Sequence, residues 1–277
     1  FQAEDGIRDS VASRGLGDVY KRQAKKLGKA ARISDASGRY IEFCKSCLQR
    51  NINFNQLKIV LDVANGATYD VAPKVFKELG AEIIVLSNQP DGTNINKNCG
   101  STDIKLLQKE VIKNKADFGI AFDGDGDRLI FVDENAKELN GDDILYVLAR
   151  DKFENQITLG SKGIVGTIMT NKGLEISLAK MGVDLIRTDV GDRHVLQKLE
   201  ELNWDLGGEQ SGHIISLDSS NSGDAIIAAI KFLEAYVCSD LSLKELLKSK
   251  GKKLKNLGDL SLIHISEPTR RYAISYA

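Results

Sequence analysis

The sequence has almost no net charge, no long apolar run and few cysteines. Its formal net charge is −1, so charge gives no reason to expect nucleic acid or an anionic membrane as a partner. No apolar run approaches the roughly 18 residues needed to span a bilayer, and no signal peptide with a basic start and an apolar centre is present. Four cysteines do not make a disulfide framework in a chain of this length. These absences predict a cytoplasmic protein that binds neither nucleic acid nor membrane.

What is present is ordinary for a globular protein: 42% of the residues are hydrophobic and 28% are charged. A length of 277 residues exceeds the usual size of one domain and favours two. Both ends look foreign, because residues 1–23 and 261–277 resemble translated sequencing-adaptor sequence and show no sustained helical or strand periodicity. We therefore expect the genuine protein to run from about Ala24 to Leu260 and to be a fragment.

One pattern of strand, Asn/Gly turn, helix, glycine and strand occurs twice in the chain. The expected elements are strands at 57–64, 81–86, 162–169 and 183–188 and helices at 68–79 and 174–181. The repeat predicts an α/β protein of two similar domains, each a mixed β-sheet covered by helices. We place the first domain at 24–136 and the second at 137–250, followed by a linker at 251–260 that leads to a missing domain.

Further helices are expected at 38–50, 103–115, 141–153, 224–236 and 242–250. Ser37 is expected to cap the first of these. The helix at 224–236 reads as amphipathic, with its isoleucines and Leu233 directed inward. Cys44-Lys-Ser-Cys47 falls inside the helix at 38–50, where neither a redox motif nor half a zinc site fits. We interpret these cysteines as small core hydrophobes.

Three aspartates at alternate positions form the stretch around which the chain is built. Asp123, Asp125 and Asp127 are separated only by Gly124 and Gly126, between two apolar runs typical of strands. Carboxylates this close repel each other and imply a cation, and the glycines allow the loop to curl until all three face one point. Hard oxygen ligands suit Mg²⁺. A solvated acidic hairpin turn is the alternative without a ligand.

Three classes of protein could contain such a loop. An EF-hand needs glycine where Arg128 stands and helices rather than strands on either side, so we exclude it. An aspartyl-phosphate phosphatase also has an apolar strand ending in Asp-x-Asp, which would make Asp123 and Asp125 nucleophile and acid. Its pattern continues with Gly-Thr, whereas here Asp127 follows the glycine. The third class is the α-D-phosphohexomutase superfamily, whose metal loop Asp-Gly-Asp-Gly-Asp-Arg this sequence resembles at every position.

Two more stretches narrow the resemblance. Asn94-Ile-Asn96 with Cys99-Gly-Ser-Thr102 resembles a loop of bacterial phosphoglucosamine mutases, and Gly208-Glu-Gln-Ser-Gly-His213 resembles their sugar-binding loop. From Leu27 to about Leu247 the chain is similar to domains two and three of that four-domain fold. A phosphomannomutase or phosphoglucomutase of the same superfamily stays open as the alternative.

The resemblance implies the interconversion of glucosamine 6-phosphate and glucosamine 1-phosphate through a phosphoserine and a bisphosphate, which feeds amino-sugar nucleotide and cell-wall precursor synthesis. It also implies one Mg²⁺ shared with the phosphoserine, and it allows a homodimer of the full-length protein. The implied site residues are the metal ligands Asp123, Asp125 and Asp127, the catalytic Arg128, and the substrate-binding Glu209, Ser211, His213, Gly191, Asp192 and Arg193. Packed or surface positions are the alternative for His213, Asp192 and Arg193.

The nucleophile that the resemblance implies is missing from the sequence. The phosphoserine of the family lies in a Ser-His-Asn segment, and none of His194, His213 and His264 follows a serine or precedes an asparagine. The chain also departs from the family pattern at His194, where tyrosine is usual, and at Ala225, where glycine is usual. We therefore expect this chain to hold metal weakly and not to turn over alone. A purely structural module would bind neither metal nor sugar phosphate.

Overall fold

The computed structural model describes residues 33–155 and 163–248. Contacts divide the chain into Phe1–Ala36, of which only the last four residues are described, and Ser37–Ala277. All contacts discussed below lie within the second unit. The expectations that fall outside the described residues concern 1–23, the domain start at 24, the linker at 251–260 and the tail at 261–277, with His264.

The first sheet has five strands in the order β2-β1-β3-β4-β5. Strand β1 pairs in parallel with β2 and β3, whereas β4 runs antiparallel to β3 and β5. The strands are β1 Lys58–Asp62, β2 Glu82–Leu86, β3 Phe118–Phe122, β4 Leu129–Asp133 and β5 Glu138–Leu139. The central strand β3 is buried along its whole length, as its continuous apolar run predicts.

The second sheet repeats this arrangement with four strands in the order β7-β6-β8-β9. Strand β6 pairs in parallel with β7 and β8, and β9 runs antiparallel to β8. The strands are β6 Gly163–Thr167, β7 Asp184–Thr188, β8 Leu206–Gly208 and β9 Ile214–Ser216. Two similar mixed sheets therefore confirm the predicted fold class, while the domain limits near Ala136 stay a prediction.

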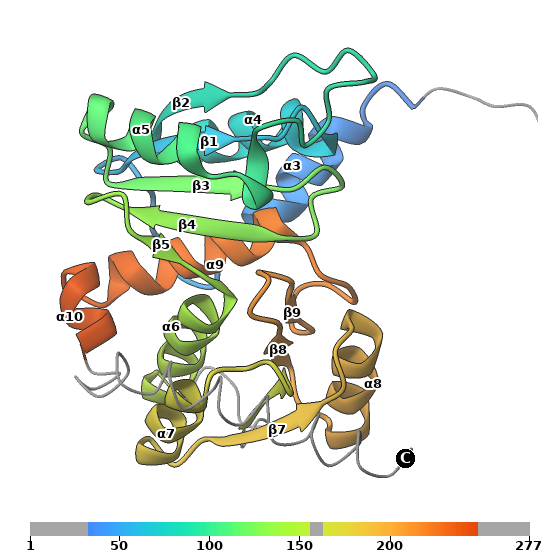
Figure 1. Ribbon diagram of the computed structural model, residues 1–277, viewed down its shortest axis with the longest axis vertical. Coiled ribbons are helices and arrows are strands. Elements are labelled where there is room, and N and C mark those ends of the chain that lie inside the picture. The colour runs from blue at the N-terminus through green and yellow to red at the C-terminus, as the bar shows by residue number, and fades with distance from the viewer. Residues whose placement is uncertain (1–32, 156–162, 249–277) are drawn as a thin grey trace, which may run out of the picture. The chain divides into compact units, whose positions relative to one another are not determined.

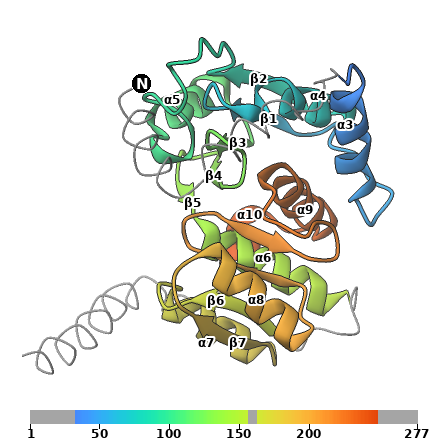
Figure 2. The ribbon, with the colours of Figure 1, turned by 90° about the vertical axis from the view of Figure 1, so that its right-hand side faces the viewer.

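Helices cover both faces of each sheet (Figures 1 and 2). Helices α3 and α4 share a core with one face of the first sheet, and α5 packs on the other. In the second sheet α8 covers one face and α6 and α7 the other. The helices associated with the first sheet are α3 Ala36–Ser46, η1 Ala67–Tyr69, α4 Val71–Glu78, η2 Gly100–Thr102 and α5 Lys105–Asn114. The later helices are α6 Gly141–Glu154, α7 Lys172–Lys180, α8 Asp192–Leu202, α9 Ala225–Cys238 and α10 Leu243–Lys248.

Helix α9 is buried all round, so the prediction that the helix at 224–236 is amphipathic was wrong. Every residue from Ala225 to Ala235 is buried, including Lys231 and Glu234. The helix lies between the two sheets (Figure 1), with the rings of Phe232 and Phe131 of β4 4.2 Å apart between centroids. A helix with partners on every side shows no polar face, and its own sequence does not reveal how many partners it has.

Helix α3 differs from expectation at both ends. It begins at Ala36 and ends at Ser46, and the Ser37 hydroxyl donates to Asp70 Oδ2 at 2.9 Å instead of capping the helix. Both cysteines predicted as core residues are free and buried. Burial raises the pKa of the Cys44 thiol to about 12, so the thiolate needed for redox or metal chemistry is disfavoured and the core interpretation is confirmed.

A cluster of buried charges joins α6 and α9 to the turn after β9. The Asp218 carboxylate accepts from Lys152 Nζ at 2.8 Å and from Lys231 Nζ at 3.1 Å. The Asp218 side chain is 13% exposed and that of Lys231 7%. Burial by itself would raise the pKa of Asp218, but the charges of the two lysines outweigh it and hold the pKa well below its usual range.

We expect Asp218→Asn to lower the free energy of unfolding by about 2–4 kcal/mol at pH 7, because Lys231 would then be buried without its counter-charge. The folded pKa lies below an unfolded value of about 3.9, so this stabilisation is present above that pH and is lost as the pH falls further. Urea unfolding should show that the difference in unfolding free energy between the wild type and Asp218→Asn is smaller at acidic than at neutral pH. The control Asp70→Asn breaks an exposed pair with Lys74 and should cost at most about 0.5 kcal/mol. A gap that is independent of pH would contradict this account.

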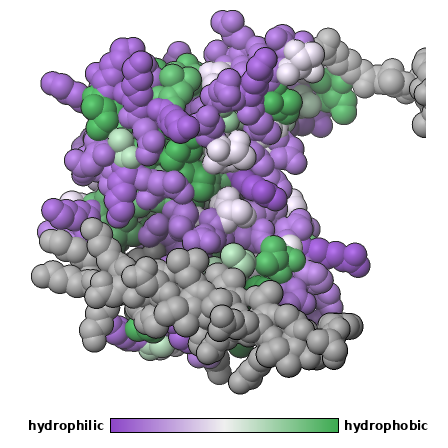
Figure 3. Space-filling view, viewed as in Figure 1, coloured by the Kyte–Doolittle hydropathy of each residue, from purple (hydrophilic) through white to green (hydrophobic). Residues whose placement is uncertain are grey.

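The face seen in Figure 3 is mainly hydrophilic, with small hydrophobic patches. Among the described residues, no helix combines the length and apolar character needed to cross a membrane. The exposed large apolar side chains include Ile95, Ile168 and Val190. These three lie in the loops that follow β2, β6 and β7, on the side of the strands that carries the predicted site residues.

Candidate active site

The loop between β3 and β4, residues 123–128, brings the three predicted metal ligands together. Asp123, Asp125 and Asp127 each offer a carboxylate oxygen, and these oxygens lie within 4.8 Å of one another. Gly126 has φ +80°, a conformation that glycine adopts without strain. The structure therefore places the three carboxylates close enough to share one cation. We call residues 123–128 the metal loop.

Asp123 closes the metal loop with its own side chain. Its Oδ1 accepts hydrogen bonds from the backbone N–H groups of Gly126, Asp127 and Arg128, each at 3.1 Å. Its backbone N–H donates to the carbonyl of Arg128 at 3.2 Å. These bonds close the loop around the Asp123 carboxylate.

The electrostatics of the loop favour a cation. Burial raises the pKa of Asp123, and the neighbouring Asp127 carboxylate raises it further, against the lowering effect of the Arg128 N–H. Two like charges held together in a half-buried loop are costly unless an opposite charge neutralises them. Clustered carboxylate oxygens are the ligands that Mg²⁺ prefers, with water or phosphate in its other positions. The residues present thus fit the ion expected from the sequence.

Two neighbouring loops pack against the metal loop so closely that only glycine fits. A Cβ atom on Gly66 would lie 2.3 Å from the carbonyl oxygen of Gly124, and one on Gly100 would lie 2.6 Å from that of Phe122, the last residue of β3 before the loop. The N–H of Ala67 donates to the Gly124 carbonyl at 2.8 Å. The turn after β1 and the stretch around Gly100 therefore hold the metal loop in place from its own domain.

The corner between β8 and β9 presents the predicted sugar-binding residues. Glu209 Oε1 accepts from the N–H of Gly191 at 2.9 Å, and Oε2 accepts from Ser211 Oγ at 3.4 Å. Gly191 has φ +128° and stands just before α8. The carboxylate of Glu209 therefore joins two stretches that hold predicted substrate-binding residues, 191–193 and 208–213. We call the second stretch the sugar corner.

The metal loop and the sugar corner are hydrogen-bonded to each other directly. Arg128 and His213 form an isolated antiparallel bridge, and the N–H of Leu129 donates to the carbonyl of Gly212 at 3.1 Å. A Cβ atom on Gly212 would lie only 2.0 Å from the carbonyl oxygen of Leu129. The backbone thus fixes the acidic loop of one domain against the glutamate–serine corner of the other.

A cavity of about 590 Å³ opens where the two loops meet, a size suited to a small-molecule ligand. Of the predicted site residues, Arg128, Glu209 and Ser211 line it. The lining residues that were not predicted from the sequence as ligands include Ser101, Thr102, Glu138, Asn140, Thr167 and Met169. Thr167 ends the parallel strand β6, so the rule that ligands bind at the carboxyl ends of parallel strands could have found it.

Four predicted substrate residues do not line this cavity: Gly191, Asp192, Arg193 and His213. His213 is 4% exposed, and its Nδ1 lies 3.1 Å from Asp127 Oδ2, against the metal loop. Asp192 and Arg193 are exposed in the first turn of α8. Their parts in substrate binding stay predictions. His194 lines a separate cavity of about 400 Å³ beside Arg187.

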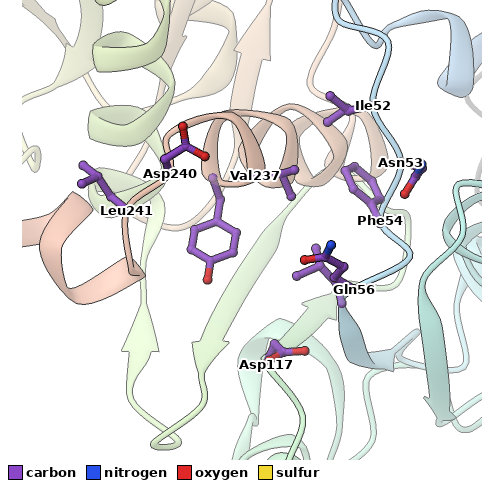
Figure 4. Close-up of a pocket in the computed structure, with 10 residues that line it drawn as sticks. Ile52, Asn53, Phe54, Gln56, Asp117, Val237, Asp240 and Leu241 are labelled. Atoms are coloured by element: carbon purple, nitrogen blue, oxygen red, sulfur yellow. The ribbon is translucent and has the colours of Figure 1, made fainter.

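Another cavity, of about 580 Å³, lies near the amino ends of the strands of the first sheet (Figure 4). Its lining includes Phe54 before β1, Asp117 before β3 and Leu241 after α9. None of the predicted site residues, all of which the structure describes, is among those that line it. The candidate site is therefore the cavity between the metal loop and the sugar corner.

Comparison with known proteins matches both halves of the chain to one family. Residues 38–138 match the family model described as phosphoglucomutase/phosphomannomutase, alpha/beta/alpha domain II, and residues 140–254 match that of domain III. The chain is 54% identical over 220 residues to the phosphoglucosamine mutase of Aliivibrio fischeri strain MJ11, which covers 79% of the chain and 49% of that protein. The chain thus spans about half the length of the curated relatives that it matches.

Two solved structures share the fold. A phosphoglucomutase/phosphomannomutase family protein from Burkholderia thailandensis aligns with a TM-score of 0.68 at 24% identity, over 84% of this chain and 51% of that one. The N-acetylphosphoglucosamine mutase of Aspergillus fumigatus, in complex with GlcNAc-6P and magnesium, aligns with a TM-score of 0.58 at 19% identity, over 76% of this chain and 52% of that one. At these identities the likeness is one of fold.

Proposed function

We propose that this chain, which belongs to the phosphoglucomutase/phosphomannomutase family, supplies the metal-binding and sugar-binding parts of a phosphoglucosamine mutase active site. The reaction proposed is the interconversion of glucosamine 6-phosphate and glucosamine 1-phosphate. The observation that carries the proposal is the backbone bridge between Arg128 and His213, because it holds the metal loop and Glu209 at one cavity. The 54% identity to a phosphoglucosamine mutase supports an amino-sugar phosphate as substrate.

Asp123, Asp125 and Asp127 would hold a Mg²⁺ ion, which when bound neutralises charge on a phosphoryl group. Asp123 prepares the site by gathering three backbone N–H groups on its Oδ1. Because the loop is already closed, little order has to be imposed when a ligand arrives. That magnesium is present in the Aspergillus enzyme of the same fold supports this choice of ion.

Arg128 would bind the phosphoryl group that moves. Its side chain is 49% exposed, and its Nε lies 3.8 Å from Asp127 Oδ1, too far for a strong hydrogen bond. The guanidinium lines the cavity and can donate two parallel hydrogen bonds to phosphoryl oxygens. Phosphoryl transfer depends mainly on positioning and charge neutralisation, and this is what an arginine in that place contributes.

Glu209 and Ser211 would orient the sugar ring. The Glu209 carboxylate is held from one side by the N–H of Gly191 at 2.9 Å, whereas its contact with Ser211 Oγ is long at 3.4 Å. A sugar hydroxyl can therefore donate to Glu209 while Ser211 donates to another oxygen of the ring. Fixed donors and acceptors of this kind distinguish one sugar from another more strongly than apolar contacts do.

The proposed reaction also needs a phosphoserine, and the sequence holds no Ser-His-Asn segment of the family type. We therefore propose that the 277-residue chain by itself binds metal and sugar phosphate without turnover. Incubation with glucosamine 6-phosphate, the bisphosphate and Mg²⁺ should yield no glucosamine 1-phosphate. Turnover that Asp125→Asn removes would show that the chain carries a nucleophile of its own.

Binding tests the function independently of turnover. In isothermal titration calorimetry with Mg²⁺ present, glucosamine 6-phosphate should bind more tightly than glucose 6-phosphate. Glu209→Gln should weaken glucosamine 6-phosphate about tenfold, since a hydrogen bond to a charged acceptor becomes a neutral one. The control Glu200→Gln, an exposed residue of α8, should change nothing. The proposed function would be contradicted if the wild-type chain bound neither glucosamine 6-phosphate nor glucose 6-phosphate.

A further inference from the structure

Behind the metal loop lies a corner formed by residues 223–225, at the start of α9. The N–H of Ala225 donates to the carbonyl of Gly126 at 3.0 Å, between the second and third aspartates of the metal loop. Gly223 lies against the imidazole of His213, since a Cβ atom on Gly223 would be 2.2 Å from His213 Nε2. The corner therefore supports the backbone of the metal loop and the ring of His213 at once.

The ring of His213 connects this corner to Asp127, one of the proposed metal ligands. Its Nδ1 lies 3.1 Å from Asp127 Oδ2, while its opposite edge rests on Gly223. At 4% exposure the ring cannot turn unless the corner moves. Partners that orient a ligating side chain are needed for full metal affinity, so the position of the corner bears on the position of the Asp127 carboxylate.

The corner itself is held by Asp224, whose two oxygens are both engaged. Oδ1 accepts from the N–H groups of Ile226 and Ile227 at 3.0 and 3.1 Å and caps α9. Oδ2 accepts from the hydroxyl of Tyr40, on α3, at 2.7 Å. Burial and the charge of Asp224 raise the pKa of Tyr40, so its hydroxyl keeps the proton that it donates.

We propose that Tyr40 is a positioning residue for the metal site, acting through Asp224 on the corner that supports Gly126 and His213. The inference rests on the proposed function insofar as the metal loop binds Mg²⁺. Tyr40 belongs neither to the carboxylate cluster nor to the lining of the cavity. Its hydroxyl ties α3 to the corner, and without that bond the carboxylate of Asp224 keeps only its helix-cap bonds. A loop that must place three oxygens around one ion binds it less tightly when its support is loose.

Ser37 provides a matched control on the same helix. Its hydroxyl donates to Asp70 Oδ2 at 2.9 Å, so Ser37→Ala removes a hydroxyl–carboxylate bond of the same kind that does not involve residues 223–225. If Tyr40 served stability alone, Tyr40→Phe and Ser37→Ala would have the same consequences. The two variants separate a general loss of stability from a specific effect on the metal loop.

The experiment compares the wild-type chain with Tyr40→Phe and Ser37→Ala. Hydrogen–deuterium exchange without metal, read in peptides that contain residues 123–128, should be about threefold or more faster in Tyr40→Phe and unchanged in Ser37→Ala. Mg²⁺ affinity from calorimetry should fall about threefold to tenfold in Tyr40→Phe alone. Asp224→Asn, which keeps a capping oxygen, should shift both readouts in the same direction as Tyr40→Phe.

Two outcomes would overturn the proposal: exchange of the metal loop that is equal in Tyr40→Phe and Ser37→Ala, or equal Mg²⁺ affinity in all three proteins. A wild-type chain that binds no Mg²⁺ contradicts the proposed function instead. In that case the exchange measurement, made without metal, still decides whether Tyr40 positions the loop.

Discussion

Asp123→Asn is expected to weaken Mg²⁺ binding by at least about 100-fold, or ~2.8 kcal/mol, because it removes one of three ligand charges. The amide oxygen of asparagine can still accept from the three N–H groups that converge on Asp123 Oδ1. The loop should therefore stay closed, and the loss should report on charge rather than on shape. Calorimetric titration with Mg²⁺ measures it.

Asp133→Asn is the matched control for this substitution. Asp133 ends β4, the strand that follows the metal loop, at the end away from the site, and its Oδ1 also accepts from two backbone N–H groups, those of Asn135 and Lys137. Mg²⁺ binding should be unchanged in this variant. Equal losses of Mg²⁺ affinity in the two variants, or full affinity in Asp123→Asn, would contradict the role of Asp123 as a metal ligand.

Asp123→Asn should have a different effect when no metal is present. Burial raises the pKa of Asp123, and Asp127 raises it further, so the charged form is disfavoured in the folded state. A raised carboxyl pKa means that stability is lost as the pH rises through it. In EDTA, Asp123→Asn should therefore be at least as stable as the wild type at pH 7, and thermal unfolding would show it.

Gly212→Ala is expected to lower the free energy of unfolding by about 4 kcal/mol or to prevent folding, the range seen for severe steric changes. The added Cβ would lie 2.0 Å from the carbonyl oxygen of Leu129. That oxygen belongs to the backbone of β4 and cannot swing aside as a side chain could. The left-handed φ of +94° adds strain of about 1 kcal/mol.

Gly182→Ala measures the backbone strain without the steric clash. It also has a positive φ, +76°, but nothing lies within 4 Å of a Cβ atom built there. Gly182→Ala should therefore cost only about 1 kcal/mol in urea unfolding. Any folded Gly212→Ala protein should also lose affinity for glucosamine 6-phosphate, because the sugar corner would be pushed off the metal loop. Similar stability losses in the two variants would contradict the described fit of Gly212 against Leu129.

Those parts of the structure that depend on neighbouring residues in the sequence could be predicted. The metal loop is one, since the spacing of Asp123, Asp125 and Asp127 already brings three carboxylates within reach of one point. The two mixed sheets are another, because the repeated order of strand, turn and helix specifies each unit locally. In both cases alternating or continuous apolar patterns and glycine positions carry the information.

What could not be predicted depends on contacts between distant segments. The bonds of Tyr40 with Asp224 and of His213 with Asp127 join residues from different elements, and no local pattern marks one partner for the other. The burial of Lys231 within α9 likewise follows from a charge partner, Asp218, outside the helix. Side chains that read as surface or helix-face residues gain their roles only once these segments meet.

The backbone bridge between Arg128 and His213 has a thermodynamic consequence. Because the acidic loop and the glutamate–serine corner share hydrogen bonds, order imposed on one by a ligand is partly imposed on the other. Such linkage is reciprocal: any factor by which a bound cation changed the affinity for sugar phosphate would equal the factor by which sugar phosphate changed the affinity for the cation. If the chain binds both ligands as proposed, a few peptide groups that belong to the bridge would set the cooperativity between them.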